Sequence, residues 1–154
     1  MNAPAAWVID TNTVLDLLLF QDPASVPLRE QLAQAGSRWI ATTAMRDELA
    51  RVLAYPQIAK RLSARAMPAA AVLGAFDAQT QIEPTAPKAP FVCKDADDQM
   101  FIDLAVAHRA TLVSKDDQVL RMARRLATLG VVVCRHWPVP LPVVKPAVRP
   151  LTSV

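Results

Sequence analysis

The sequence has little glycine and little cysteine. The three glycines among its 154 residues form neither a GxxxxGK nor a GxGxxG pattern, so the loops that cradle the phosphates of nucleotide cofactors are missing. Cys93 and Cys134 are too far apart for a CxxC metal pair, and two cysteines do not make a disulfide framework. We therefore expect two reduced thiols and no nucleotide cofactor.

Long apolar runs are also missing. The longest apolar-rich runs, 14–20 and 66–76, are interrupted by Asp16 and Pro68 respectively. Neither approaches the roughly 20 residues that a membrane-spanning helix needs. Residues 1–6 lack the basic segment and the long apolar segment of a secretory signal. We expect no membrane span and a cytoplasmic location.

The composition is that of a globular chain with an uneven charge distribution. It is 53% apolar and 20% charged, with a net charge of +3, which suits one domain with a sizeable core. If four of the 14 acids were gathered in one site, the 17 basic residues would face only ten acids elsewhere. Such an excess favours a polyanionic partner, such as nucleic acid.

Short apolar segments of strand character alternate with segments of helical periodicity. Strands are predicted at 7–9, 38–41, 80–83, 111–114 and 131–134, and helices at 14–20, 26–35, 44–53, 56–62, 63–76 with a bend near Pro68, 98–109 and 117–129. This order predicts an α/β fold, in which helices cover both faces of a parallel sheet. We assign residues 1–136 to this domain and residues 137–154, which hold five of the 13 prolines, to an extended tail.

Asp10 directly follows the first predicted strand. In open α/β sheets ligands bind outside the carboxyl ends of the strands, so an acid at this edge is a candidate site residue. Thr11, Asn12 and Thr13 are suited to cap the helix that begins at Val14. The alternative is that Asp10 is only a turn or capping residue.

Further acids follow other predicted strands or begin helices: Glu48, then Asp95, Asp97 and Asp98, then Asp116 and Asp117. Each cluster on its own is explained by the helix dipole, which favours acids at amino termini by about 0.3–1 kcal/mol. That explanation does not account for three strand ends delivering carboxylates to one edge of a sheet. Because these like charges repel, a bound cation is the simplest way to stabilise them.

Helix geometry selects among neighbouring acids. Asp47 is four residues before Arg51 and suits a surface ion pair, whereas Glu48 lies at the border of the buried face. Asp98 precedes the core residue Phe101 by three positions, whereas Asp95 and Asp97 are freer to act as caps. Carboxylates without a neighbouring histidine or cysteine select Mg²⁺ or Mn²⁺ over zinc. Surface or packing roles are expected for the two histidines, His108 and His136.

Four segments together resemble the motifs of the PIN domain: VIDTN at 8–12, the acid Glu48, DDQMFIDLA at 97–105 and LVSKD at 112–116. The resemblance covers about 7–134 and is nearest to the VapC-like toxin ribonucleases of bacterial toxin-antitoxin pairs. It implies a three-layer α/β/α sandwich with a central parallel sheet, Mg²⁺ or Mn²⁺ in an acidic pocket, and cleavage of RNA. Carried over, the metal-binding and catalytic acids are Asp10, Glu48, Asp98 and Asp116, with Asn12 and Ser114 as polar supports. Asp117 departs from the pattern by doubling the last acid.

These acids suggest a mechanism and a set of partners. An ion held by Asp10, Asp98 and Asp116, which Glu48 reaches directly or through water, would lower the pKa of a bound water and neutralise charge on the scissile phosphate. A second ion could enter with the substrate. Arg46, Lys94 and Lys115 are candidates for phosphate contacts or, equally, for solvated surface residues. The alanine-rich segment 66–76 and the tail predict a homodimer or a complex with a cognate antitoxin protein.

Three other functional classes share some of these features. A haloacid-dehalogenase-like phosphatase needs a second Asp two residues after the first, where this chain has Asn12. A receiver domain places its phosphoacceptor after the third strand, which does not suit Asp10. The remaining alternative is a catalytically silent PIN-fold module that binds RNA or a protein partner.

Overall fold

A computed structural model of the chain describes residues 5–138. Its centre is a five-stranded parallel sheet with the strand order β3-β2-β1-β4-β5. The strands are β1 (Ala5–Ile9), β2 (Ser37–Ala41), β3 (Thr80–Ile82), β4 (Thr111–Val113) and β5 (Val132–Cys134). Each predicted strand is therefore present, within two residues of the expected bounds.

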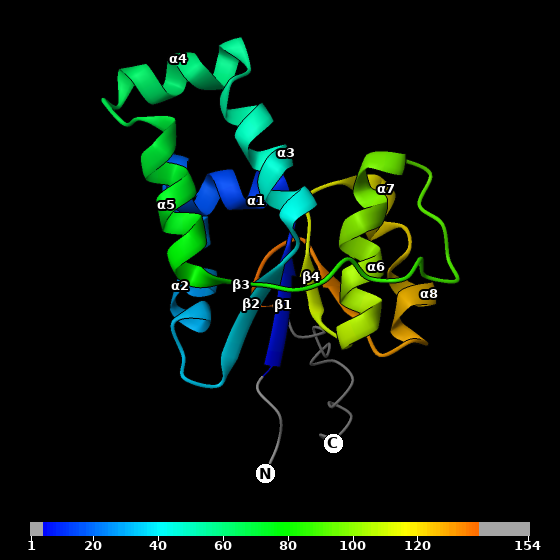
Figure 1. The fold of residues 1–154 in the computed structure, drawn as a ribbon. Helices are drawn as coiled ribbons and strands as arrows, with labels where there is room; N and C mark the ends of the chain where they lie inside the picture. Colours follow the sequence, from blue (N-terminus) through cyan, green and yellow to red (C-terminus); the bar gives the residue numbers. More distant parts are fainter. Residues whose placement is uncertain (1–4, 139–154) are drawn as a thin grey trace, which may run out of the picture.

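Helices cover both faces of the sheet (Figure 1). On one side are α1 (Thr11–Leu15), continued by a π-helical turn at Asp16–Phe20, a 3-10 turn at Pro23–Ser25, α2 (Val26–Leu32), α3 (Thr43–Leu53), α4 (Pro56–Ala64) and α5 (Ala69–Gln79). On the other are the 3-10 turn Ala96–Asp98, α6 (Gln99–His108), α7 (Asp117–Leu120) and α8 (Ala123–Ala127). The predicted α/β/α sandwich on a parallel sheet is confirmed.

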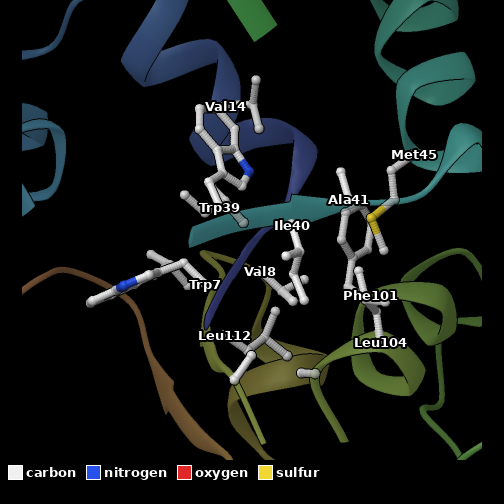
Figure 2. Close-up of a cluster of buried hydrophobic side chains, with 14 of the residues drawn as sticks. Trp7, Val8, Val14, Trp39, Ile40, Ala41, Met45, Phe101, Leu104 and Leu112 are labelled. Atoms are coloured by element: carbon white, nitrogen blue, oxygen red, sulfur yellow. The ribbon is translucent and has the colours of Figure 1, made fainter. Parts of the chain in front are cut away.

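The central strands are nearly all apolar because they are buried on both faces. Val8 and Ile40 are fully buried and point toward Phe101 of α6 (Figure 2). Trp39 points the opposite way, toward Val14 of α1, and its ring meets Phe76 of α5 edge-on, with the ring centroids 5.5 Å apart. The core is thus continuous through the sheet and fixes both helical layers to it.

The predicted helix 63–76 with a bend at Pro68 is wrong. α4 continues through Ser63 to Ala64, and the chain then turns at Ala66, which has a left-handed φ of 51°. Pro68 is the residue before the first turn of α5 rather than a kink inside one helix. The reason is that proline lacks an amide donor and disfavours helical backbone in the residue before it, here Met67.

Two further expectations on helices need correction. Asp10 itself, rather than Thr11, Asn12 or Thr13, caps α1, which begins three residues before Val14. The predicted helix 117–129 is interrupted between α7 and α8, where the Met122 amide bonds to the Val119 carbonyl three residues back. No proline or glycine marks this break, so local sequence does not signal it.

The parallel sheet brings the carboxyl ends of its strands to one edge. Asp10 follows β1 there, and Ser114 follows β4. Thr42 follows β2 and caps α3 by accepting a 3.3 Å hydrogen bond from the Met45 amide. This edge is where the candidate residues meet.

Two expectations concern regions away from that edge. Among residues 5–138, no helix is long and apolar enough to cross a membrane. The proline-rich tail lies, from residue 139 onward, outside the described part of the chain. Trp137, the first residue of the tail, is described and packs edge-on against Trp7 of β1, with ring centroids 4.7 Å apart.

Candidate active site

Asp10 is a buried carboxylate that is held on both oxygens. Its Oδ1 accepts a 2.9 Å hydrogen bond from the Thr13 amide, and its Oδ2 accepts from the Ser114 hydroxyl at 2.6 Å and the Lys115 amide at 3.3 Å. Only 5% of the residue is exposed. Asp10 therefore caps α1, which is the alternative role considered for it. It is also hydrogen-bonded to Ser114 at the end of β4.

Ser114 connects Asp10 to the last acid of the set. While its hydroxyl donates to Asp10, it accepts a 3.1 Å hydrogen bond from the Asp116 amide. Asp116 in turn caps α7, because its Oδ1 accepts from the Gln118 amide at 2.7 Å. Fully buried Ser114 thus fixes the backbone on which Asp116 is mounted relative to Asp10.

Asp98 and Asp116 lie close to each other and to Asp95. One carboxylate oxygen from each of the three lies within 4.8 Å of the other two. Asp95 had been assigned only a capping role, and it does cap the 3-10 turn by accepting from the Asp97 amide at 3.0 Å. The structure shows that the same side chain also joins the acid cluster.

Burial, together with the crowding of acids, raises the pKa of Asp98. Burial raises the pKa of Asp98 to about 7, and hydrogen bonding to Asp116 and repulsion from Asp116, Asp95 and Asp10 act in the same direction. Without a cation, the carboxyl group of Asp98 holds a proton over much of the acidic range. Its Oδ2 atom is buried and has no hydrogen-bond partner among residues 5–138.

Glu48 comes from α3, on the other helical layer. Burial raises its pKa, while a hydrogen bond donated by the Thr11 hydroxyl to Glu48 Oε1 opposes that rise. Thr11 is therefore a site residue that we did not anticipate beyond its capping potential. Its place between Asp10 and Asn12 was the only signal in the sequence.

All four predicted acids line one cavity of about 150 Å³. Its walls are formed by Asp10, Thr11, Asn12, Glu48, Val52, Asp98, Phe101 and Asp116. Of the predicted polar supports, Asn12 is in the wall, whereas Ser114 lies behind it. A neighbouring cavity of about 270 Å³ shares Glu48 and is lined by Asp47, Arg51 and Asp97 among others.

Two of the three basic residues proposed for phosphate contacts have other partners. Arg46 forms a two-pronged ion pair with Asp77 of α5, at 2.7 and 2.8 Å. Lys115 is 2.6 Å from Asp16. Lys94 forms no ion pair among the described residues. The ion pair that the spacing of Asp47 and Arg51 predicts is not formed in this part of the chain either.

The predicted packing roles of the histidines are partly visible. His108 lies at the end of α6, with its Nε2 3.8 Å from an oxygen of Glu83. His136 lines a different, small cavity, together with Trp137 and Lys115. No histidine or cysteine lines the acidic cavity of the described structure.

The donor set of this cavity suits a hard divalent cation. Its candidate ligands are carboxylate oxygens, which Mg²⁺ and Mn²⁺ prefer. The unpartnered Oδ2 of Asp98 is the kind of buried polar atom that a ligand would satisfy. Because a cation would also relieve the repulsion that raises the pKa of Asp98, the residues present fit such an ion.

The family model described as PIN domain matches residues 6–118. The chain belongs to the PIN domain family. This confirms the resemblance at the level of the family, whereas the closer likeness to VapC-like toxins stays a prediction. A search of curated proteins found no match. PIN domains are generally nucleases that use divalent metals, and this PIN domain carries a cluster of acids at the carboxyl edge of its sheet.

Proposed function

We propose that this PIN domain is a divalent-metal-dependent endoribonuclease, with Asp10, Glu48, Asp98 and Asp116 as its metal-binding and catalytic acids. The observation that carries the proposal is the convergence on one cavity of four acids from separate segments: the ends of β1 and β4, α3, and the turn before α6. Keeping four carboxylates together is unfavourable without a cation. The arrangement is therefore better explained by ion binding than by four separate helix caps.

The chain's own residues have distinct tasks in this proposal. Asp10 is held by three hydrogen bonds and presents a fixed carboxylate. Asp98 would give up its proton in favour of a bound cation, and Asp116 is aligned with Asp10 through Ser114. Bound Mg²⁺ or Mn²⁺ supplies a Lewis acid that lowers the pKa of water and neutralises charge on the scissile phosphate. Glu48, held on one oxygen by Thr11, keeps the other for the ion or its water.

The substrate is proposed to be RNA that extends beyond the acidic cavity. The neighbouring cavity, which shares Glu48, gives an extended strand a path between α3 and the start of α6. Arg51 lines that path and replaces Arg46 as the candidate for a phosphate contact, because Asp77 neutralises Arg46. The net charge of +3 supports binding of a polyanion.

The biological setting belongs to the same proposal. We infer a cytoplasmic toxin component of a toxin-antitoxin pair that resembles VapC, with a cognate antitoxin protein as partner and a homodimer as its form. The motifs at 8–12, 97–105 and 112–116 support this setting. Co-expression with the product of a small neighbouring reading frame, followed by co-purification and relief of growth arrest, tests it.

The nuclease proposal is tested with purified protein and a mixed RNA pool. Mn²⁺ or Mg²⁺ is expected to give fragments, and excess EDTA is expected to stop their formation. Cutting that continues undiminished in EDTA contradicts the mechanism. Calorimetry separates the alternative, because a catalytically silent module with a degenerate pocket would neither cut RNA nor bind Mn²⁺.

A further inference from the structure

The loop 83–94 connects β3 to the 3-10 turn that carries Asp95 and Asp98, and it has no regular secondary structure. Figure 1 shows this loop running from β3, on one side of the molecule, to the start of α6 on the other. Pro84, Pro87 and Pro90 remove three backbone donors from it. The loop therefore cannot fix its own path through a backbone hydrogen-bond ladder, yet it ends at the acid cluster.

Gln99, in the first turn of α6, binds this loop at two points. Its Oε1 accepts a 2.6 Å hydrogen bond from the Cys93 amide, and its Nε2 donates to the Phe91 carbonyl at 3.1 Å. The residue is only 9% exposed. The buried Gln99 side chain therefore satisfies the backbone amide and carbonyl groups that a neighbouring strand would otherwise bind.

Asp103, one helical turn later, completes the arrangement. Its Oδ1 accepts a 2.8 Å hydrogen bond from the Ala89 amide and a second, also 2.8 Å, from Gln99 Nε2. The loop is thus held at alternate residues, 89, 91 and 93, and Ala89 and Cys93 are buried against the helix. Asp95 follows two residues after the last anchored amide.

We propose that Gln99 and Asp103 are positioning residues for the metal site, acting through the loop that delivers Asp95 and the turn holding Asp98. Neither side chain lines the acidic cavity. Their hydrogen bonds fix the position of the end of the loop. That position determines how close the Asp95 carboxylate lies to those of Asp98 and Asp116. The inference rests on the proposed metal-dependent function.

The test compares substitutions that remove the anchoring bonds with one that keeps them. Asp103→Ala loses the acceptor for both amide groups, and Gln99→Leu loses all three bonds of Gln99. Asp103→Asn keeps an oxygen acceptor of the same shape. Asp103→Ala is the milder of the two removals, because Asp103 is half-buried and alanine favours helix. Leu126→Ala, in the buried face of α8, is a control for general loss of stability.

Mn²⁺ affinity by calorimetry is the main readout. Asp103→Ala and Gln99→Leu are expected to weaken Mn²⁺ binding by about 10- to 100-fold, as substitutions behind metal ligands typically do. Saturating Mn²⁺ should restore most of the RNA cleavage rate in these variants. Asp103→Asn and Leu126→Ala should bind Mn²⁺ nearly as tightly as the parent. Hydrogen exchange at the Ala89 and Cys93 amides should accelerate in Asp103→Ala and Gln99→Leu.

The outcomes separate this inference from the function on which it rests. A parent protein that neither binds Mn²⁺ nor cuts RNA overturns both. A parent that does both, with unchanged Mn²⁺ affinity in Asp103→Ala and Gln99→Leu, overturns only the positioning role. Equal weakening by Leu126→Ala also overturns it, since the effect would then follow from stability alone.

Discussion

Ser114 and Asp10 are joined by a 2.6 Å hydrogen bond across 104 positions of the chain. The bond connects the carboxyl ends of β4 and β1, and both residues are buried. Because Ser114 also accepts from the Asp116 amide, this one hydroxyl sets the relation between the first and the last acid of the cavity. Its removal should therefore affect both stability and the site.

Ser114→Ala is expected to lower the free energy of unfolding by about 1–3 kcal/mol, since a buried carboxylate oxygen loses a hydroxyl donor. Cleavage of RNA should fall as well, because Asp10 and Asp116 are no longer aligned. Urea unfolding and a cleavage assay measure the two effects. Ser25→Ala, at a second buried serine away from the acids, should leave the cleavage rate unchanged. Parent-like behaviour of Ser114→Ala in both assays would contradict this account.

Replacing a proposed ligand acid by its amide keeps the shape and removes the charge. Asp10→Asn and Asp98→Asn are each expected to lower RNA cleavage by orders of magnitude and to weaken the rise in melting temperature caused by Mn²⁺. Asp47 is exposed and lines only the neighbouring cavity, where a negative charge does not favour RNA, so Asp47→Asn should cut RNA at least as well as the parent. If Asp47→Asn were as inactive as Asp98→Asn, the assignment of acids would be wrong.

The pKa of Asp98, raised to about 7, gives the metal-free protein a specific pH dependence. Between its ordinary value near 4 and about 7, the folded state holds a proton on Asp98 that the unfolded state has released. Stability in EDTA should therefore fall as pH rises through this window. Asp98→Asn should remove this contribution, so its thermal unfolding in EDTA should depend less on pH. An identical slope in parent and variant would assign the pH dependence to other groups.

Cation binding should displace the proton that Asp98 holds in the metal-free protein. Because the ion and the proton compete for Asp98, the Mn²⁺ affinity of the parent should increase as pH rises toward and past 7. Calorimetry in buffers of different ionisation enthalpy should detect release of the proton on binding below pH 7. Affinity that is flat between about pH 6 and about pH 8, roughly one unit on either side of the Asp98 pKa, would speak against this competition.

Thr11 controls the ionisation of Glu48. Its hydroxyl lowers the pKa of Glu48 against the larger effect of burial, so Thr11→Val should raise that pKa further. The acidic limb of the pH profile of RNA cleavage is then expected to move to higher pH. Thr11→Ser keeps the donor and should keep the parent profile. A shift of the same size in both variants would exclude the hydroxyl as its cause.

Local sequence was enough to predict the sheet, because strands buried on both faces are nearly all apolar and leave a direct pattern, as in 7–9 and 111–114. It also placed acids at the strand ends, since position after a strand is itself a local property. The bounds of α5 were not predicted correctly. A proline between two helical segments can bend one helix or precede another, and packing decides which.

The side-chain partners could not be predicted in the same way. Arg46 is a candidate for a phosphate contact by sequence, but in the structure it binds Asp77 of α5, two helices later in the chain. The sequence predicts only a capping role for Asp95, yet its carboxylate lies close to those of Asp98 and Asp116. Both errors concern where a side chain points once distant segments pack together.

The sequence by itself determined the α/β class, the parallel order of short apolar strands and the supply of carboxylates at one edge, because each depends on residues within one or two turns. Only the tertiary structure decided that Ser114 would bond to Asp10, that Thr11 would hold Glu48 and that Gln99 would anchor the loop before Asp95. These contacts join separate elements of the fold. Their geometry follows from how the helical layers pack on the sheet, and hydrophobic periodicity carries no record of that packing.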